Sequence, residues 1–497
     1  MESTSELQHN LDSPQGTKFD AEQQIDPEQW ELYLAGQRKP DPEPVDADAN
    51  PEQDALLKEQ LQRLSSAIVH KAPYCQGTIP LPAEASTLFY GRPGNAHAVN
   101  LTHASLEELQ HLAETCDPAT FGVDQKDVYD EAYRKAGKLD SSDFALNFSP
   151  ERAGVLEAVR AELLVEGRKS TTDSILAELY KLNVYGPGSF FKAHMDTPRS
   201  ELMLGSLVIV FPTPHEGGAL ALRESGEGER REWIFDSAAL LDGASEPSIA
   251  YVAFYSDTEH EVMPVQSGYR VTITYNLYFV KDYAALGGAA PLAHPVGTNE
   301  ELFRSTLRGL LEDPTFLPEG GNLLFALHHQ YPLSTSHKSL EAAKQALRDV
   351  ASRLKGSDAV ILRVIQELSL EASLRIVYQD TGGFSDYTRY VMCDHVVDLE
   401  NVPEVSDTLS SFLRRKEKGV LLNPDTKRHP WYAEDPDTAQ AHWIVSSPWK
   451  FNSTHTTYMA YGNQASFEHT YWRISIFVCV GPVGRRETVT AELTTQK

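Results

Sequence analysis

Polar and apolar residues alternate along two segments in the middle of the chain, 180–185 and 269–280, as is typical of strands with one polar face. Because residues i and i+2 of a strand project from the same side, the two faces of each segment can be assigned. The polar faces hold Lys181, Asn183 and Tyr185, and Arg270, Thr272, Thr274 and Asn276; the opposite faces hold Tyr180, Leu182 and Val184, and Val271, Ile273, Tyr275 and Leu277. We predict that the second strand lines a polar pocket. Apolar runs at 204–211 and 249–255 predict two further strands.

Apolar residues spaced by three or four predict helices on both sides of these strands. Helices are expected over 56–69, from the capping box of Ser105 and Glu108, and from Ser149, where an apolar stripe would cover the outer face of a sheet. Another helix is expected over 339–354, with Gly356 as its stop signal, and a strand over 472–480. The two helical stripes are Val155, Leu156, Val159 and Leu163, and Leu340, Ala343, Leu347, Val350 and Leu354.

The length of 497 residues predicts two or more domains. Residues 1–55 hold 14 acidic and three basic residues with few apolar ones, so we predict an acidic disordered tail. A stretch rich in Gly, Ala and Pro at 286–291 predicts a linker. The expected division is a tail over 1–55, a domain of helices and strands over 56–284, and an α+β region over 296–497.

One short motif suggests a metal site. His194 and Asp196 are two residues apart after a Gly-Pro-Gly turn, so a strand would place them side by side. With 17 histidines and 71 acids, such a pair arises by chance roughly two to three times, and alone it is weak. If His260 joins from a facing strand, two imidazoles and one carboxylate form the facial set of non-heme Fe(II) oxygenases. We therefore predict a metal site of His194, Asp196 and His260.

The polar strand faces supply candidates for binding a carboxylate ligand near this metal. Arg270 can pair bidentately with a carboxylate, and Thr272 can add a hydroxyl hydrogen bond. Tyr185 and Asn183 can reach the same ligand, although ordinary strand packing is the alternative for both. For Arg270 the alternative is an exposed surface arginine. The role of Lys181 is left open.

Three other histidines are weaker candidates. His215 lies in a Pro- and Gly-rich segment that predicts a turn, and we reject it as a ligand. His328 and His329 are adjacent, so in a strand they would point to opposite faces, and we predict a structural role for them.

With these motifs in place, the chain resembles the prolyl 4-hydroxylase-like branch of the Fe(II)/2-oxoglutarate-dependent dioxygenases over about 77–280. The segment from His260 through Glu261-Val262-Met263-Pro264 to Arg270 is the most similar part. The resemblance implies that His194, Asp196 and His260 hold iron, that Arg270 binds the distal carboxylate of 2-oxoglutarate with help from Thr272, and that Tyr185 hydrogen-bonds this cosubstrate. It also implies a double-stranded β-helix, or jelly roll, with flanking helices. The C-terminal region would be a degenerate second barrel or a helical cap.

The implied activity is oxidation of a substrate with Fe(II), 2-oxoglutarate and O2, releasing succinate and CO2. The substrate, whether protein proline, an amino acid or a metabolite, stays open. One alternative is a nucleic-acid demethylase of the same superfamily, because Asn183 and Tyr185 precede the metal motif there too. The formal charge of −27 argues against this alternative. The other is a non-catalytic scaffold with a vestigial barrel, against which the intact ligand set argues.

The remaining composition bears on compartment and partners. Four widely separated cysteines form no CxxC pair and predict neither a zinc site nor a disulfide framework. The N-terminus lacks a signal-peptide pattern, and no apolar run is long enough to cross a bilayer. We therefore expect a soluble cytoplasmic or nuclear protein that binds a small-molecule or peptide substrate, with its oligomeric state open.

Overall fold

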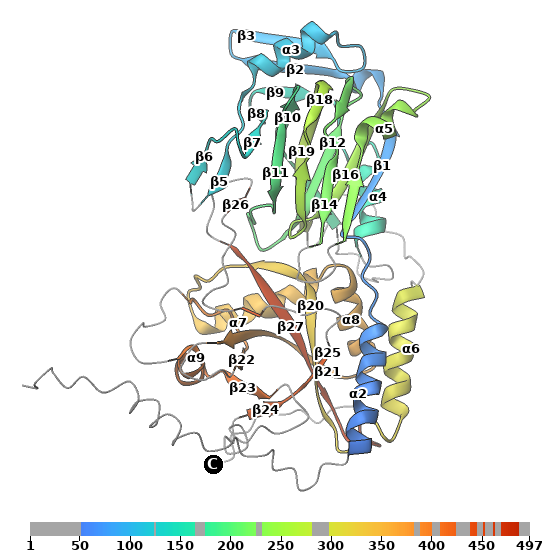
Figure 1. Ribbon diagram of the computed structural model, residues 1–497, viewed down its shortest axis with the longest axis vertical. Helices are drawn as coiled ribbons and strands as arrows, with labels where there is room; N and C mark the ends of the chain where they lie inside the picture. The colour runs from blue at the N-terminus through green and yellow to red at the C-terminus, as the bar shows by residue number, and fades with distance from the viewer. Residues whose placement is uncertain are drawn as a thin grey trace, which may run out of the picture.

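The computed structural model describes residues 51–123, 126–164, 174–224, 231–280, 298–381, 388–399, 408–423, 438–444, 451–452, 461–462 and 469–486. The predicted linker at 286–291 and residues 1–50 of the predicted tail lie outside these ranges. Helix α2 (Pro51–Ser66) begins inside the tail predicted over residues 1–55. The last five residues of that tail are therefore helical rather than disordered. Figure 1 shows two groups of elements, one above the other, with α2 beside α6 (Thr298–Glu312) in the lower group.

The upper group contains two antiparallel sheets. The larger has seven strands, in the order β1 (Tyr74–Pro80), β16 (Ser248–Tyr255), β12 (Met203–Val210), β19 (Arg270–Val280), β10 (Ser174–Tyr185), β8 (Gly137–Asp140) and β4 (Asp117–Pro118). The smaller has five, in the order β15 (Glu232–Phe235), β14 (Leu220–Arg223), β17 (Glu259–Val262), β11 (Phe190–His194) and β7 (Arg134–Lys135). Strand β13 (His215–Gly217) pairs with β18 (Val265–Gly268), while β2 (Thr87–Arg92) lies between β3 (Asn95–Asn100) and β9 (Phe144–Leu146). The strands predicted at 204–211, 249–255 and 269–280 are present and begin within one residue of their expected start, whereas the strand predicted at 180–185 is the end of β10, which begins six residues earlier, at Ser174.

Apolar side chains pack on both faces of the larger sheet. On one face, Val252 and Phe254 cluster with Phe191, Leu222 and Val262 of the smaller sheet. The other face carries the helices α3 (Leu106–Thr115) and α4 (Val155–Leu163). That outer core contains the predicted helical stripe and the predicted apolar face of β19: Val155, Leu156, Val159, Leu163, Val271, Ile273, Tyr275 and Leu277. The polar face of β19 is thus directed to the space between the sheets.

Helix boundaries follow local backbone chemistry. The predicted capping box is confirmed, because the Glu108 amide donates to Ser105 Oγ and the Ser105 amide donates to the Glu108 carboxylate. Helix α4 begins at Val155 rather than Ser149, because Gly154 takes a left-handed φ of 77° that ends the preceding turn. The helix predicted over 339–354 ends earlier, as α7 (Leu340–Asp349) followed by a 3₁₀ turn. Gly356 is not a stop signal, since it begins helix α8 (Gly356–Glu367).

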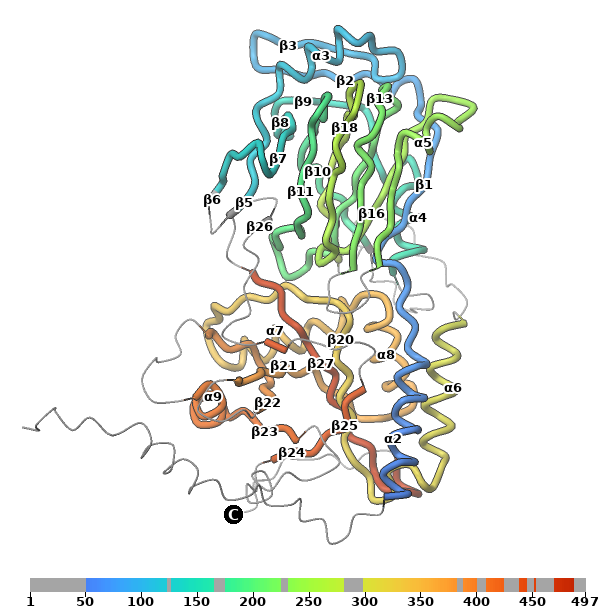
Figure 2. Tube along the Cα trace, viewed as in Figure 1, coloured from blue at the N-terminus to red at the C-terminus, as the bar shows by residue number. Residues whose placement is uncertain are grey.

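The lower group is built on one mixed sheet. Its strand order is β24 (Thr438–Gln440), β23 (Val420–Asn423), β22 (Arg389–Cys393), β21 (Glu371–Asp380), β27 (Thr470–Val480), β20 (Gly321–Leu333) and β25 (His442–Ile444). Helices α2, α6, α7, α8 and α9 (Leu409–Glu417) contribute to one apolar core with this sheet. Figure 2 shows β27 rising from this sheet toward the upper group. The α+β composition agrees with prediction, while the degenerate-barrel reading of this region stays a prediction.

The packing of helix α2 differs from what the predicted domain boundaries imply. Its residue Leu64 and the following Ala67 join the core that also holds Phe303 and Leu307 of α6. We therefore keep the division into domains as a proposal, but place α2 with the C-terminal part. Among the described helices none is long and apolar enough to cross a membrane. All four cysteines lie in described segments as free thiols.

Candidate metal centre

The three predicted metal ligands lie together between the two sheets. His194 is the last residue of β11 and pairs directly with His260 of β17, while Asp196 follows two residues after His194. Their potential ligand atoms all lie within 4.8 Å of one another. Each residue is buried, with no more than 6% of its surface exposed. The pairing of β11 with β17 therefore brings together two histidines that are 66 positions apart.

Hydrogen bonds orient each of these side chains. Nδ1 of His194 lies 2.8 Å from the Lys192 carbonyl oxygen, and Nδ1 of His260 lies 3.0 Å from the Thr258 carbonyl oxygen. A carbonyl only accepts, so each Nδ1 donates a proton and Nε2 is the ring nitrogen available to a metal. Nε2 of His260 lies 3.9 Å from Oδ1 of Asp196. One ligand atom from each residue is therefore close enough to the others for the three to share one metal ion.

The Asp196 carboxylate is held from behind. Ser206 Oγ, on β12, donates to Asp196 Oδ2 at 2.6 Å, which leaves Oδ1 directed toward His260. Burial lowers the pKa of His194 well below its usual value, and His260 acts in the same direction. The imidazole is therefore neutral, the form that binds a metal. Two imidazoles and one carboxylate are the donor set of a facial Fe(II) site.

Arg270 lies on the wall of the same pocket and lacks a full set of partners. It begins β19 opposite Tyr185 of β10, and only 1% of its surface is exposed. Its Nε donates to Ser237 Oγ at 3.5 Å, while Nη2 has no hydrogen-bond partner among the described residues. Burial lowers its pKa to about 10, although Tyr185 and Asp236 oppose this shift. A buried guanidinium nitrogen without an acceptor is costly, and a ligand carboxylate would satisfy it.

The absence of a side chain at Gly218 leaves room for this guanidinium. Gly218 has a φ of 72°, and a Cβ there would lie 2.9 Å from Arg270 Cδ and 2.8 Å from Val265 Cγ2. A larger residue would therefore displace the arginine. Ser237, which accepts from Arg270, begins the short helix α5 (Ser237–Asp242).

All the predicted site residues line one pocket. They are His194, Asp196, His260, Arg270, Tyr185, Thr272 and Asn183. Thr272 Oγ1 donates to the backbone oxygen of Asn183 at 3.4 Å, so this hydroxyl ties β19 to β10. The Asn183 side-chain oxygen is occupied, because Arg134 Nη2 donates to it at 3.0 Å.

Other pocket residues were not predicted. Ser206 and Arg134 line the pocket, and so does Tyr180, which strict alternation assigned to the opposite face of β10. A register shift between Leu179 and Lys181 breaks the alternation, so Tyr180 and Lys181 both reach the pocket. Ser206 had a usable signal, because it is the only hydroxyl residue in an otherwise apolar strand. Arg134 had none.

His215 is not part of the ligand group found among the described residues. It lies in strand β13, not in a turn, because it pairs with Gly268 of β18. Its Nδ1 is 2.8 Å from the Thr213 carbonyl oxygen, and its Nε2 is 3.4 Å from Ser237 Oγ.

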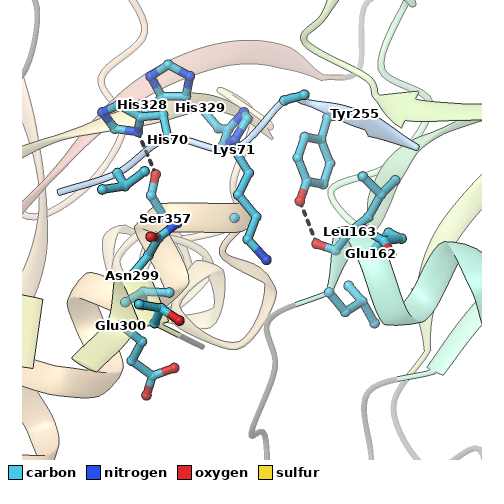
Figure 3. A pocket seen from close by; sticks show the side chains of 16 residues that line it. His70, Lys71, Glu162, Leu163, Tyr255, Asn299, Glu300, His328, His329 and Ser357 are labelled. Atoms are coloured by element: carbon cyan, nitrogen blue, oxygen red, sulfur yellow. Dashed lines mark hydrogen bonds between the residues drawn. The ribbon is translucent and has the colours of Figure 1, made fainter. Parts of the chain in front are cut away.

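The adjacent histidines of β20 lie at a second pocket, of about 400 Å³, between the two groups of elements. Figure 3 shows His70, His328 and His329 close together there. His328 stacks on His70 with ring centroids 4.1 Å apart, and its Nε2 lies 2.9 Å from a Glu224 carboxylate oxygen. The prediction that His328 and His329 point to opposite faces is wrong, since their rings are 4.9 Å apart. The register of β20 shifts at this point, which breaks the alternation.

A comparison with protein families identifies the chemistry of the first pocket. Residues 180–278 match the model of the 2OG-Fe(II) oxygenase superfamily. The matched segment contains the three candidate ligands and Arg270 in the order and pairing described above. This chain carries a 2OG-Fe(II) oxygenase domain. A search of curated proteins finds no matching relative.

Solved structures of oxygenases also resemble this domain. A prolyl-4-hydroxylase of Pseudomonas putida is 16% identical in sequence, with a TM-score of 0.25. The matched region covers 45% of this chain and 98% of the Pseudomonas putida chain. A Trichoplax adhaerens prolyl hydroxylase, solved with a hypoxia inducible factor peptide fragment, is 16% identical in sequence, with a TM-score of 0.25. The matched region covers 48% of this chain and 96% of the Trichoplax adhaerens chain.

The cofactors of this dioxygenase are Fe(II), 2-oxoglutarate and O2, and the pocket residues fit them. The donor set of His194, Asp196 and His260 suits Fe(II). The unpartnered Nη2 of Arg270 suits the distal carboxylate of 2-oxoglutarate. When bound, these cofactors supply the oxidising chemistry, while the chain supplies orientation and a buried site.

Proposed function

We propose that this oxygenase hydroxylates or otherwise oxidises a substrate, with release of succinate and CO2, in the manner of prolyl hydroxylases. The observation that carries the proposal is that one buried pocket holds both a set of metal-binding side chains and an arginine that lacks a hydrogen-bond acceptor. One is the set of His194, Asp196 and His260, whose donors converge within 4.8 Å. The other is Arg270, whose Nη2 has no acceptor among the described residues.

Each residue predicted for the site receives a role under this proposal. His194, Asp196 and His260 bind Fe(II), with their Nδ1 hydrogen bonds fixing the imidazole rings. Arg270 binds the distal carboxylate of 2-oxoglutarate, and Tyr185, its cross-strand neighbour, hydrogen-bonds the same cosubstrate. Thr272 and Asn183 hold β19 and β10 together beneath it.

The proposal includes a double-stranded β-helix as the fold of the oxygenase domain. Its support is the pair of facing antiparallel sheets, of seven and five strands, with an apolar core and the pocket between them. A site between two sheets is shielded from water on both sides, which favours retention of a reactive oxidant.

The test is turnover of 2-oxoglutarate by the full-length chain. Many purified pools of metabolites and peptides can be screened for substrate-dependent formation of succinate, against background turnover without substrate. Asp196→Ala should abolish both activities because it removes a metal ligand, while Glu216→Ala, an exposed acid outside the pocket, should leave them unchanged. A wild-type chain that loads Fe(II) but never forms succinate would favour the non-catalytic alternative.

A further inference from the structure

The pocket wall carries a second buried arginine, to which the proposed function assigns no role. Arg134, on β7, is only 5% exposed. Its Nη1 donates to the Thr120 carbonyl oxygen at 2.7 Å and its Nη2 to Asn183 Oδ1 at 3.0 Å, while Nε has no partner among the described residues. Both partners are neutral, and no described carboxylate forms an ion pair with Arg134. A buried charge without a counter-charge costs free energy, and a ligand could remove this cost.

Lys181 adds a second positive charge to the same wall. It lines the pocket with Arg134, and its Nζ lies 4.5 Å from the centroid of the Tyr180 ring. The guanidinium of Arg199 lies 3.8 Å from that centroid, so both cations flank one aromatic ring. No described carboxylate lies within ion-pair distance of Lys181. This cationic wall contrasts with the formal charge of −27 for the whole chain.

The charges of the cofactors leave this wall unbalanced. Fe(II) with Asp196, the two carboxylates of 2-oxoglutarate and the guanidinium of Arg270 sum to zero. Arg134 and Lys181 then remain as extra positive charges facing the pocket. Resting on the proposed oxygenase function, we propose that Arg134 and Lys181 form a subsite for a carboxylate of the substrate that is oxidised.

A carboxylate suits the donors that are present. Both Nη atoms of Arg134 already donate to protein oxygens, whereas Nε has no partner among the described residues. Nε and the Lys181 ammonium are therefore the groups that we expect to meet the two oxygens of one planar anion. A phosphate would present a third oxygen and a higher charge, for which the described wall offers no additional free guanidinium. The carboxylate could belong to a free amino acid or metabolite, or to an acidic side chain in a peptide.

The subsite lies near the metal ligands. The Arg134 guanidinium is 4.3 Å from the centroid of the Phe191 ring, and the His194 imidazole is 3.6 Å from that same ring. One aromatic ring therefore contacts both the proposed anion-binding residue and a metal ligand. The carbon that is oxidised would lie close to the bound carboxylate, so the position of Arg134 would select both the substrate and the site of oxidation.

The test uses acetate as a probe on the full-length protein, loaded anaerobically with Fe(II) and saturating 2-oxoglutarate. Thermal unfolding is followed with sodium acetate, with sodium chloride at equal ionic strength, and with acetamide. The variants are Arg134→Met, Lys181→Gln and, as control, Lys135→Gln, an exposed lysine next to Arg134 that does not line the pocket. The visible band of iron-chelated 2-oxoglutarate is recorded for each variant, so that cofactor loading is measured separately.

We expect acetate, but neither chloride nor acetamide, to raise the unfolding midpoint of the wild type by a few degrees. Binding should weaken by about thirtyfold or more in Arg134→Met and by several-fold in Lys181→Gln, with the cofactor band retained and Lys135→Gln unaffected. Equal effects of acetate in the wild type and in Lys181→Gln would overturn the proposal even if Arg134→Met fails to fold. Absence of the cofactor band in the wild type would instead contradict the proposed function.

A second arm identifies the source of the carboxylate. Free amino acids are compared with their amides, and peptides containing Asp with the same peptides containing Asn, for substrate-dependent succinate formation. In any pair that supports turnover, we expect succinate formation with the member that carries the carboxylate and none with its amide counterpart. Stabilisation by inorganic phosphate or a methylated oligonucleotide with no response to acetate would overturn the carboxylate assignment in favour of a phosphate-bearing substrate.

Discussion

The hydroxyl of Tyr471 donates to the backbone carbonyl oxygen of Asp196 at 2.9 Å, although 275 positions separate the two residues. The same hydroxyl lies 2.9 Å from the Ser256 carbonyl oxygen. Tyr471 is in β27 of the C-terminal sheet, which extends toward the oxygenase domain in Figure 1. Burial raises the pKa of Tyr471 well above its usual value, so it remains a donor at all ordinary pH. The C-terminal part therefore supports a candidate iron ligand.

Replacing Tyr471 by Phe should weaken Fe(II) binding. The change leaves two buried carbonyl groups with one fewer donor, which costs about 1–3 kcal/mol, and it relaxes the backbone that positions Asp196. We expect an increase of about tenfold in the Fe(II) dissociation constant, measured by anaerobic titration. Tyr90→Phe is the control, since Tyr90 is also buried but its hydroxyl is hydrogen-bonded to His111. Equal iron affinities in wild type and Tyr471→Phe would show that the contact is only structural.

Ser206 should matter through the carboxylate that it holds. Ser206→Ala removes the hydrogen bond to Asp196 Oδ2 and frees the carboxylate to rotate. Loss of such a supporting contact typically weakens metal affinity by about 10–100-fold. Ser206→Thr, which keeps the hydroxyl, should retain more affinity than Ala. An Ala variant with wild-type iron affinity would contradict the assignment of Asp196 as a ligand held by Ser206.

A buried ion pair joins the two groups of elements. Lys355 Nζ lies 2.9 Å from Asp257 Oδ1, and His329 Nδ1 lies 3.1 Å from Asp257 Oδ2, with every partner at least 94% buried. Burial acts to raise the pKa of Asp257, but Lys355 and His329 outweigh it and lower the pKa below its usual 3.8. Asp257→Asn leaves Lys355 buried without a counter-charge and should cost about 3–5 kcal/mol.

The pH dependence of this contribution follows from the lowered pKa. A carboxylate with a depressed pKa in the folded state stabilises the protein above its unfolded pKa and loses that contribution as the pH falls. The difference in stability between wild type and Asp257→Asn should therefore be constant at neutral pH and shrink below about pH 4. Denaturant unfolding at several pH values measures it. A difference that stays constant below pH 4 would contradict this assignment.

Lys181 should make anion binding depend on pH. Burial lowers its pKa from 10.5 to about 8, with Lys138, Arg134 and Arg199 acting the same way and Asp140 opposing. Lys181 is therefore charged below about pH 8, so stabilisation by acetate should decline as the pH rises through that value. Without a ligand, the lowered pKa means that Lys181 destabilises the folded chain below about pH 8, and this penalty should be lost as the pH rises from 8 to 10.5, where only the unfolded chain keeps the proton. Acetate titrations of wild type and Lys181→Gln check this, since the variant should show no such decline.

Local patterns predicted most of the site, because its central residues lie on regular strands. His194 and Asp196 are neighbours in sequence, and alternation correctly directed Arg270 and Thr272 to the pocket. The same rule misplaced Tyr180 and His328, because register shifts in β10 and β20 interrupt the alternation. A period of two cannot reveal where a strand carries an extra residue.

Other residues depend on tertiary contacts that no local pattern encodes. Arg134 comes from a strand of two residues, too short to show any periodicity. Tyr471 reaches Asp196 from the far end of the chain, and α2 packs on α6 rather than on the strands that follow it. These contacts arise from the packing of whole sheets and helices, so they could not be predicted from windows of sequence.

The central claim is that one buried pocket binds both Fe(II) and 2-oxoglutarate. Anaerobic titration of the full-length chain with both cofactors tests it most directly, through the visible charge-transfer band of the chelated cosubstrate. We expect a band in the wild type, its loss in His194→Ala, a weaker 2-oxoglutarate affinity in Arg270→Ala, and no change in His97→Ala, a histidine far from the pocket. A folded wild-type chain that gives no band with both cofactors would contradict the account.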